Sequence, residues 1–211
     1  MLLVKNFFSV LRNPSLFRTM AIMAFFLMLV QVNRVGGGVL ASELSDGYSL
    51  SPTMIGLVIG SMFFAAAVVQ VPVGLMLDSF GARRTLVGLS VIAVSGMILI
   101  GFASGAAELI IGRILVGIGH GASITGVYLL AVVWTSPERV STVAAITIAV
   151  GGALGGILGT APLAISFETL GFSDTFVLLA IASLFSSFLI WKLIDEKDSF
   201  TNKPNLSLIH I

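Results

Sequence analysis

Six long apolar segments constrain this sequence of 211 residues more than any other feature. A helix that crosses a bilayer needs roughly 20 predominantly apolar residues. Segments of that kind occur at 17–41, 53–77, 84–104, 108–134, 139–165 and 174–194. Their length, and the Gly and Pro within them, favour helices over barrel strands, which are about 10 residues long and alternate in polarity. The sequence therefore predicts an all-α, polytopic membrane protein with six transmembrane helices.

Composition excludes several other classes of protein. Hydrophobic residues make up 57% of the sequence and charged residues only 10%, whereas soluble domains carry about 25% charged residues. This leaves too little polar surface to cover a soluble core. The net charge of +1 gives no reason to expect a nucleic-acid partner. The absence of cysteine excludes disulfides, thiolate metal sites and cysteine catalysis, and we expect no cofactor and no metal.

The basic residues predict the orientation, because cytoplasmic loops of membrane proteins carry an excess of Lys and Arg. With the N-terminus in the cytoplasm, that side holds Lys5, Arg12, Arg18, Arg83, Arg84, Arg139, Lys192, Lys197 and Lys203. The outer loops then hold no basic residue and carry Glu43, Asp46, Glu108, Glu168 and Asp174. We therefore expect a multi-pass protein of the plasma membrane, the inner membrane of a bacterium, with both termini cytoplasmic.

The predicted organisation has three parts. Residues 1–16 form a cytoplasmic N-terminal segment, residues 17–194 form the six-helix bundle, and residues 195–211 form a polar cytoplasmic tail. The tail lacks the apolar surface that would let it order itself. We interpret it as the start of a central linker that is cut short, with final residues that need not be native.

A motif follows the second predicted helix, Gly74-Leu75-Met76-Leu77-Asp78-Ser79-Phe80-Gly81-Ala82-Arg83-Arg84. It resembles the signature of the major facilitator superfamily: Gly, three residues, Asp, a basic residue, any residue, Gly and a basic pair. Ser79 replaces the usual basic residue, and Ala82 moves the Arg pair one place along. In that family the motif latches the cytoplasmic side and opens when the transporter changes state.

Each position of the motif has a physical interpretation. Gly74 would let helix 2 pack closely on a neighbour, Asp78 would interact with a helix end, and Gly81 would allow a tight turn. Arg83 and Arg84 would sit at the headgroups and bridge to carboxylates, although they could equally be plain positive-inside anchors. The resemblance implies that the gate also includes the next cytoplasmic loop, Glu138-Arg139.

The fourth and fifth helices extend the resemblance. Gly112-Arg113-Ile114-Leu115-Val116-Gly117-Ile118-Gly119-His120-Gly121 looks like the family's fourth-helix pattern of Arg and spaced glycines. A packing stripe of small residues follows in helix 5, at Gly151, Gly155 and Gly159. The resemblance implies the N-terminal half of a twelve-helix fold, built from two inverted three-helix repeats. Its partner would be a C-terminal six-helix half or a second copy of the chain.

Ionisable side chains inside a bilayer are expensive and therefore mark functional candidates. Three occur within the predicted spans: Arg34, Arg113 and His120. From the helix rise, the two arginines lie at similar depth in the outer half, and His120 lies about 10 Å deeper, near the midplane. Further substrate-binding candidates are polar residues of the same and neighbouring helices: Gln31, Asn33, Gln70 and Tyr128.

The arginines favour an anionic substrate, because no acidic residue lies within these spans and the guanidinium fork matches carboxylate or phosphate. Alternatively, Arg34 and Arg113 extend their side chains to the membrane surface or have a purely structural role. Organic-anion and sugar-phosphate carriers of the family often have Asp-Arg in helix 1. Here the pair is Asn33-Arg34, which puts proton coupling there in doubt. His120 could titrate near neutral pH or donate to a helix carbonyl.

The sequence thus predicts secondary active transport of a small, anionic organic solute by alternating access, and no enzymatic activity. Three alternatives stay open: a transporter-derived sensor that binds a solute without net transport, a drug–proton antiporter, and a six-helix protein that works as a homodimer. The antiporter is disfavoured because Gly159-Thr160-Ala161-Pro162 is only loosely like its Gly-Pro signature. The expected partners are a small-molecule solute and the lipid bilayer.

Overall fold

A computed structural model describes residues 13–194. Over this range the chain forms helices and no strands, so the all-α prediction is confirmed. The helices are α2 (Pro14–Val35), α3 (Gly37–Tyr48), α4 (Pro52–Val68), α5 (Gln70–Gly101), α6 (Ala106–His120), α7 (Ser123–Trp134), the 3-10 turn η1 (Pro137–Arg139), α8 (Val140–Leu158), α9 (Ala161–Leu170) and α10 (Phe172–Leu193). Residues 1–12 of the predicted N-terminal segment (1–16) and the whole predicted tail (195–211) lie outside the described residues.

Local sequence signals set where the first two spans begin. The Asn13 side chain accepts hydrogen bonds from the backbone N–H groups of Ser15 and Leu16, both at 3.2 Å. The Ser51 hydroxyl oxygen likewise accepts a hydrogen bond from the backbone N–H of Met54 at 3.3 Å. In both cases proline is the first helical residue, where its missing N–H removes a donor that would have no partner. The first helix therefore starts at Pro14 rather than at residue 17.

The six predicted spans are present, but several are broken. Five stretches of the described chain are each long and apolar enough to cross a membrane: Pro14–Val35, Gln70–Gly101, Ala106–Trp134, Pro137–Leu158 and Phe172–Leu193. The second span is divided between α4, which has 17 residues, and the start of α5. Gly81 then separates helix 2 from helix 3 inside α5, with φ 81° and ψ 171°. Helices 1 and 5 run further than predicted, to Tyr48 and Leu170.

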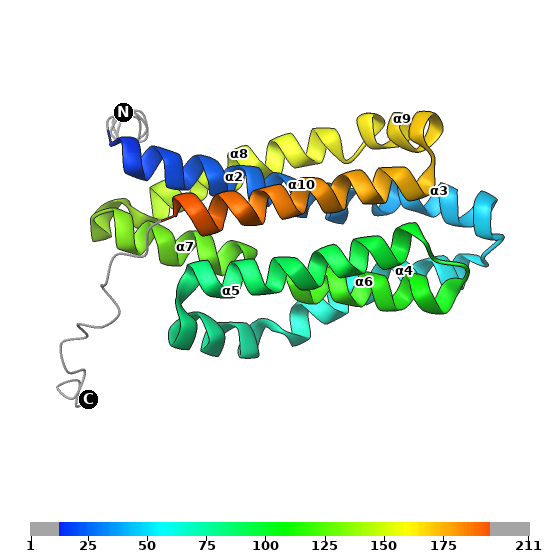
Figure 1. The fold of residues 1–211 in the computed structure, drawn as a ribbon, viewed down its shortest axis with the longest axis horizontal. Coiled ribbons are helices and arrows are strands. Elements are labelled where there is room, and N and C mark those ends of the chain that lie inside the picture. The colour runs from blue at the N-terminus through cyan, green and yellow to red at the C-terminus, as the bar shows by residue number, and fades with distance from the viewer. Residues whose placement is uncertain (1–12, 195–211) are drawn as a thin grey trace.

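The packing of the helices has the symmetry of an internal repeat. Helix 1 (α2) packs on helices 5 and 6 (α8 and α10), while helix 4 (α6) packs on helices 2 and 3 (α4 and α5). If helices 1, 2 and 3 are exchanged with helices 4, 5 and 6 respectively, the contacts of helix 1 become those of helix 4. The α5–α10 contact, between helices 3 and 6, maps onto itself. Figure 1 shows the two groups as separate layers, as expected for two three-helix repeats.

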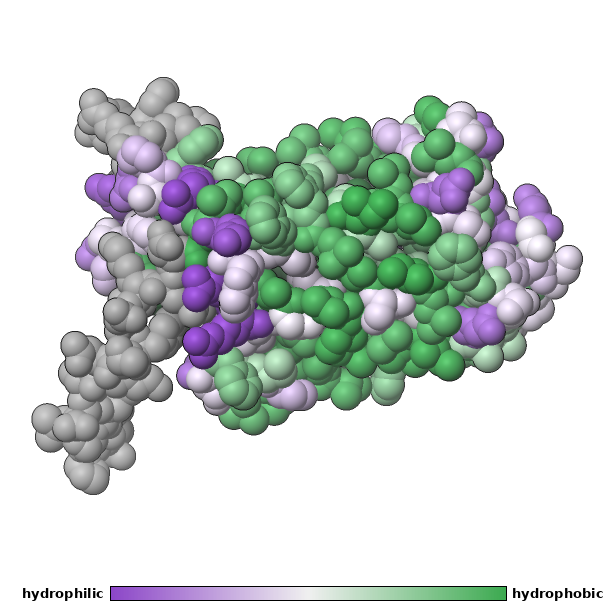
Figure 2. Space-filling model, viewed as in Figure 1, coloured by the Kyte–Doolittle hydropathy of each residue, from purple (hydrophilic) through white to green (hydrophobic). Residues whose placement is uncertain are grey.

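An apolar surface covers the middle of the bundle on the face drawn in Figure 2. On the face drawn in Figure 2, hydrophobic residues cover the centre, and hydrophilic residues gather at both ends. Large apolar side chains such as Phe64, Val71 and Phe102 are exposed. A soluble protein rarely exposes so large an apolar patch, whereas a lipid-facing surface requires one. The chain is therefore a multi-pass membrane protein.

Candidate functional site

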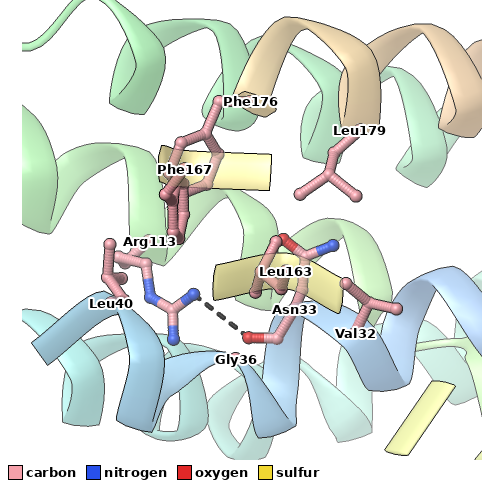
Figure 3. Close-up of a pocket in the computed structure, with 9 residues that line it drawn as sticks. All are labelled: Val32, Asn33, Gly36, Leu40, Arg113, Leu163, Phe167, Phe176 and Leu179. Atoms are coloured by element: carbon pink, nitrogen blue, oxygen red, sulfur yellow. Dashed lines mark hydrogen bonds between the residues drawn. The ribbon is translucent and has the colours of Figure 1, made fainter. Parts of the chain in front are cut away.

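Helix 1 is divided at Gly36, which keeps a right-handed helical conformation and hydrogen bonds to Val32 and Leu40, and a buried polar group lies beside this point. Gly36 lies between α2 and α3, outside both helices. The backbone carbonyl of Asn33 accepts a hydrogen bond from Arg113 Nη1 of α6 at 3.2 Å (Figure 3). The Arg113 side chain is only 2% exposed. Its charge is placed at the C-terminal end of α2, where the helix dipole is partly negative.

A second break occurs in helix 4. Gly121 lies between α6 and α7, and its carbonyl accepts a hydrogen bond from Gln70 Nε2 at 3.3 Å. A Cβ added to Gly121 would lie 2.4 Å from Cγ1 of Val69, which separates α4 from α5. The breaks of helices 2 and 4 therefore meet. A bilayer tolerates an interrupted helix when a neighbouring helix forms hydrogen bonds to the backbone groups at the interruption, as Gln70 does for Gly121.

The breaks of helices 1 and 5 meet in the same way. A Cβ on Gly36 would lie 2.5 Å from Leu163 of α9, and 3.8 Å from the carbonyl oxygen of Gly159, where α8 ends. Exchanging helices 1–3 with helices 4–6 places this pair of breaks on the pair in helices 2 and 4. Interrupted helices of this kind form the substrate sites of many transporters.

His120 ends α6 beside the second break. Its ring is 2% exposed and meets Phe26 of α2 edge-on, with 6.3 Å between the ring centroids. Its Nδ1 atom has no hydrogen-bond partner among the described residues. Of the three ionisable candidates, Arg34 lies on α2, and Arg113 and His120 lie on α6.

Arg34 differs from Arg113 in its surroundings. It is half-buried, and it makes no hydrogen bond or ion pair with residues 13–194. Gln31, one turn earlier, lies against Gly155 of α8. Tyr128 lies on α7, eight residues beyond His120, and is 42% exposed. The structure therefore groups Arg34, Asn33, Gln70, Arg113 and His120 around the breaks, and leaves Gln31 and Tyr128 at the edges.

The motif between helices 2 and 3 lies at the same end of the bundle as residues 13 and 194 (Figure 1). Gly81 makes the turn at a positive φ, and Thr85 Oγ1 donates to the carbonyl of Met76 at 3.1 Å across it. Arg83 stacks on the Trp191 ring of α10, at 5.1 Å. The Asp78 carboxylate is exposed and pairs with none of residues 13–194.

The structure adds two facts about this motif. A Cβ on Gly74 would meet nothing within 4 Å, so the close contact expected at Gly74 is not made within residues 13–194, and its role stays a prediction. Arg83 contacts an aromatic ring of helix 6, which was not foreseen, because the two residues are far apart in the sequence. Arg84, Glu138 and Arg139 are exposed, the last two on η1 at this same end.

The glycine stripe of helix 5 packs inside the bundle. A Cβ on Gly151 would lie 2.6 Å from the carbonyl oxygen of Ala24, and one on Gly155 would lie 2.3 Å from that of Met28. Gly159 likewise approaches Val32. Within the described chain the stripe therefore packs on helix 1. Gly117 of helix 4 packs against the Met62 backbone.

Sequence reasoning missed the helix breaks, which are the main feature of this region. The run Gly36-Gly37-Gly38 is the one signal that could have indicated the break in helix 1. Among the described residues, no group of three or more His, Cys, Asp or Glu side chains could hold a metal ion. The arrangement offers cationic and amide groups to a ligand, and no set of residues for hydrolysis or group transfer.

Comparison with known proteins places this geometry in context. The family model described as Major Facilitator Superfamily matches residues 15–207. A probable sulfoacetate transporter of Cupriavidus necator is 25% identical over 165 residues, which cover 78% of this chain and 38% of that protein. A hexuronate transporter of Bacillus subtilis is 30% identical over 188 residues, which cover 84% of this chain and 43% of that protein.

A solved structure has the same fold. The inward-open xylose transporter XylE from E. coli superposes with a TM-score of 0.69 at 16% sequence identity, over 83% of this chain and 47% of that one. The chain therefore spans less than half the length of each of these three proteins.

Proposed function

Because the chain belongs to the Major Facilitator Superfamily, a family of solute transporters rather than enzymes, we propose that it is the N-terminal half of a carrier for a small organic anion. In this proposal a second six-helix bundle completes the solute path, and Arg34 binds the anionic group. The protein resides in the plasma membrane with both termini cytoplasmic.

Arg34 is the observation that carries the proposal. Its side chain is half-buried and has no partner among residues 13–194, in contrast to Arg113. A cation at membrane depth is strongly disfavoured without compensation. A carboxylate or sulfonate would supply that compensation through two parallel N–H···O bonds.

The names of the relatives support an anionic solute. Sulfoacetate and hexuronates both carry a negative group at neutral pH, and transporters named for them align with most of this chain. The two proteins are named for chemically different anions, one of them a sugar acid. The shared requirement is therefore a cationic anchor, which Arg34 provides.

The breaks suggest how binding is coupled to movement. Anion binding at Arg34 would act directly on helix 1, which is interrupted two residues later at Gly36. In alternating access the two halves then rock about the bound solute. The motif at Asp78, Gly81, Arg83 and Arg84 would open and close the cytoplasmic side, together with Glu138 and Arg139.

A binding experiment tests the proposal. The protein encoded by the complete reading frame that contains this chain is purified, and binding of glucuronate and sulfoacetate is measured for wild type and Arg34→Gln. We expect the substitution to weaken binding by about 10–100-fold, because a charged hydrogen bond contributes about 1.5–3 kcal/mol. Lys192→Gln is the matched control, since it removes an exposed cation at the end of α10. Equal affinity in wild type and Arg34→Gln would refute Arg34 as the anion anchor.

A further inference from the structure

An apolar groove runs between α2 and α8, the first and fifth helices. Its volume is about 420 Å³, within the range of about 300–1,000 Å³ that is usual for sites that hold small molecules. Of the described residues that line it, Thr147 alone has a polar side chain, and its hydroxyl donates to the carbonyl of Val143 at 2.9 Å. The lining therefore suits a hydrocarbon chain and not a polar solute.

The groove has the depth of one leaflet of a bilayer. Its lining extends from Phe17 to Met28 on α2 and from Val143 to Leu154 on α8, which is roughly 16 Å along each helix. Half of the hydrocarbon core of a bilayer is about 15 Å. Both helices begin at the end of the bundle that holds residue 13 (Figure 1). In the predicted orientation, the groove therefore spans the cytoplasmic leaflet.

The groove opens away from the side of α2 that carries Arg34. Helix α8 packs on one flank of α2, where Gly151 approaches the Ala24 carbonyl. Helix α10 packs on the other flank (Figure 1), where Phe185 meets Phe25 edge-on with 6.4 Å between the ring centroids. Arg34 lies about two and a half turns beyond Phe25 and therefore faces the opposite way. A second bundle that completes the proposed solute path at Arg34 thus leaves the groove open to lipid.

An arginine stands one turn before the groove on each of its two helices. Arg18 precedes Ala21 by three residues and Arg139 precedes Val143 by four, and these spacings put side chains on the same face of a helix. Both arginines are exposed. The Arg139 guanidinium makes no hydrogen bond or ion pair with the described residues, the neighbouring Glu138 included. Because both helices begin here, their partly positive N-terminal ends also favour an anion at the mouth of the groove.

We propose that an anionic phospholipid binds here, with one acyl chain in the groove between α2 and α8 and its phosphate at Arg18 and Arg139. Basic sites between transmembrane helices on the cytoplasmic side bind such headgroups, and the guanidinium fork matches the phosphate oxygens. The N-terminal segment 1–12 is a poorer occupant, because its charged side chains are Lys5 and Arg12, which repel the two arginines.

Native mass spectrometry tests the charge requirement. The protein from the complete reading frame is mixed with phosphatidylglycerol or phosphatidylcholine of identical acyl chains, and the bound lipid is measured. We expect tighter binding of phosphatidylglycerol, weakened about fivefold in Arg139→Gln, as expected for one basic residue near a membrane surface. Arg84→Gln, which removes an exposed cation from α5, is the matched control. Equal binding of the two lipids, or equal losses in the two variants, would overturn the proposal.

Ala21→Phe tests the groove separately from the charge. Ala21 is an exposed lining residue, so the added ring fills the groove without entering the core. We expect several-fold weaker binding of both lipids, with an unchanged melting temperature in lipid-free detergent. Gly88→Phe adds the same ring in open space on α5 and should bind lipid like the wild type. Wild-type lipid binding by Ala21→Phe would show that the acyl chain does not lie in the groove.

A structure of the complete protein in phosphatidylglycerol nanodiscs shows the occupant directly. We expect chain-like density along the groove, with a headgroup at Arg18 and Arg139 and no connection to the protein. Density continuous with residue 13 would assign the groove to segment 1–12, and a helix in it would assign it to the second bundle. Either result, or an empty groove, overturns the proposal. None of these measurements involves the solute, so their failure leaves the anion site at Arg34 to its own test.

Discussion

Close helix contacts in this bundle depend on individual glycines, and adjacent glycines of α8 behave differently. A Cβ on Gly155 would lie 2.3 Å from the Met28 carbonyl oxygen, whereas one on Gly156 would meet nothing within 4 Å. Gly155→Ala should therefore lower the stability by about 1–3 kcal/mol through overpacking. Thermal unfolding in detergent measures this. Gly156→Ala is the matched control and should be neutral or slightly stabilising; equal behaviour of the two variants would contradict the packing described.

Gly81 is required for a different reason. Its φ of 81° and ψ of 171° lie in a region that other residues rarely adopt. Gly81→Ala should cost about 1–3 kcal/mol, also measured by thermal unfolding. Gly88→Ala, further along α5 in open space, provides the comparison. An unchanged melting temperature in Gly81→Ala would mean that the chain turns differently between helices 2 and 3.

The chemical candidates could be chosen from the sequence, but their roles could not. Arg34, Arg113 and His120 stand out because ionisable residues are rare within apolar spans. Arg113 finds its partner in a carbonyl of helix 1, 80 residues away in the sequence. No pattern local to Arg113 contains this information.

At the scale of helices, length and hydropathy predicted the six spans to within a few residues at most ends. The breaks were not predictable in the same way, because these helices are apolar on nearly all sides. Apolar periodicity therefore says little about where a helix is interrupted. Interruptions depend on which neighbour can accept or donate, as Gln70 does for Gly121.

The turn between helices 2 and 3 carries a prediction about movement. If Asp78 belongs to a cytoplasmic gate, Asp78→Asn should slow turnover several-fold while leaving solute affinity within about twofold, because the gate is remote from Arg34. Exchange across proteoliposomes, compared with equilibrium binding, separates the two effects. Ser79→Ala, at the neighbouring exposed position, is the control. Unchanged exchange by Asp78→Asn would remove Asp78 from the gate.

For the whole molecule, the lack of cysteine gives a clean test of orientation. A membrane-impermeant maleimide applied to intact cells should label Ser45→Cys, which lies near the end of α3, and should not label Ser79→Cys. Permeabilised cells should label both, and wild type should remain unlabelled. The reverse pattern in intact cells would contradict the topology predicted from Lys and Arg.

The repeat architecture was implied by the family resemblance and is visible in the helix contacts. Composition alone indicates a helical membrane protein, whereas the pairing of helices 1 with 5 and 2 with 4 depends on glycines that face particular neighbours. In the proposed carrier the solute path needs surfaces beyond residues 13–194, so its chemistry could be predicted only as far as the cation on helix 1.

Solute uptake into proteoliposomes tests the central claim most directly. The protein from the complete reading frame is reconstituted, and initial uptake of labelled glucuronate and sulfoacetate is compared with that of neutral xylose, for wild type, Arg34→Gln and Lys192→Gln. We predict that the wild type takes up at least one of the anions faster than xylose. This uptake should be lost in Arg34→Gln and retained in Lys192→Gln. Wild-type anion uptake by Arg34→Gln, or binding of the anion without any flux in the wild type, would contradict an anion carrier anchored at Arg34.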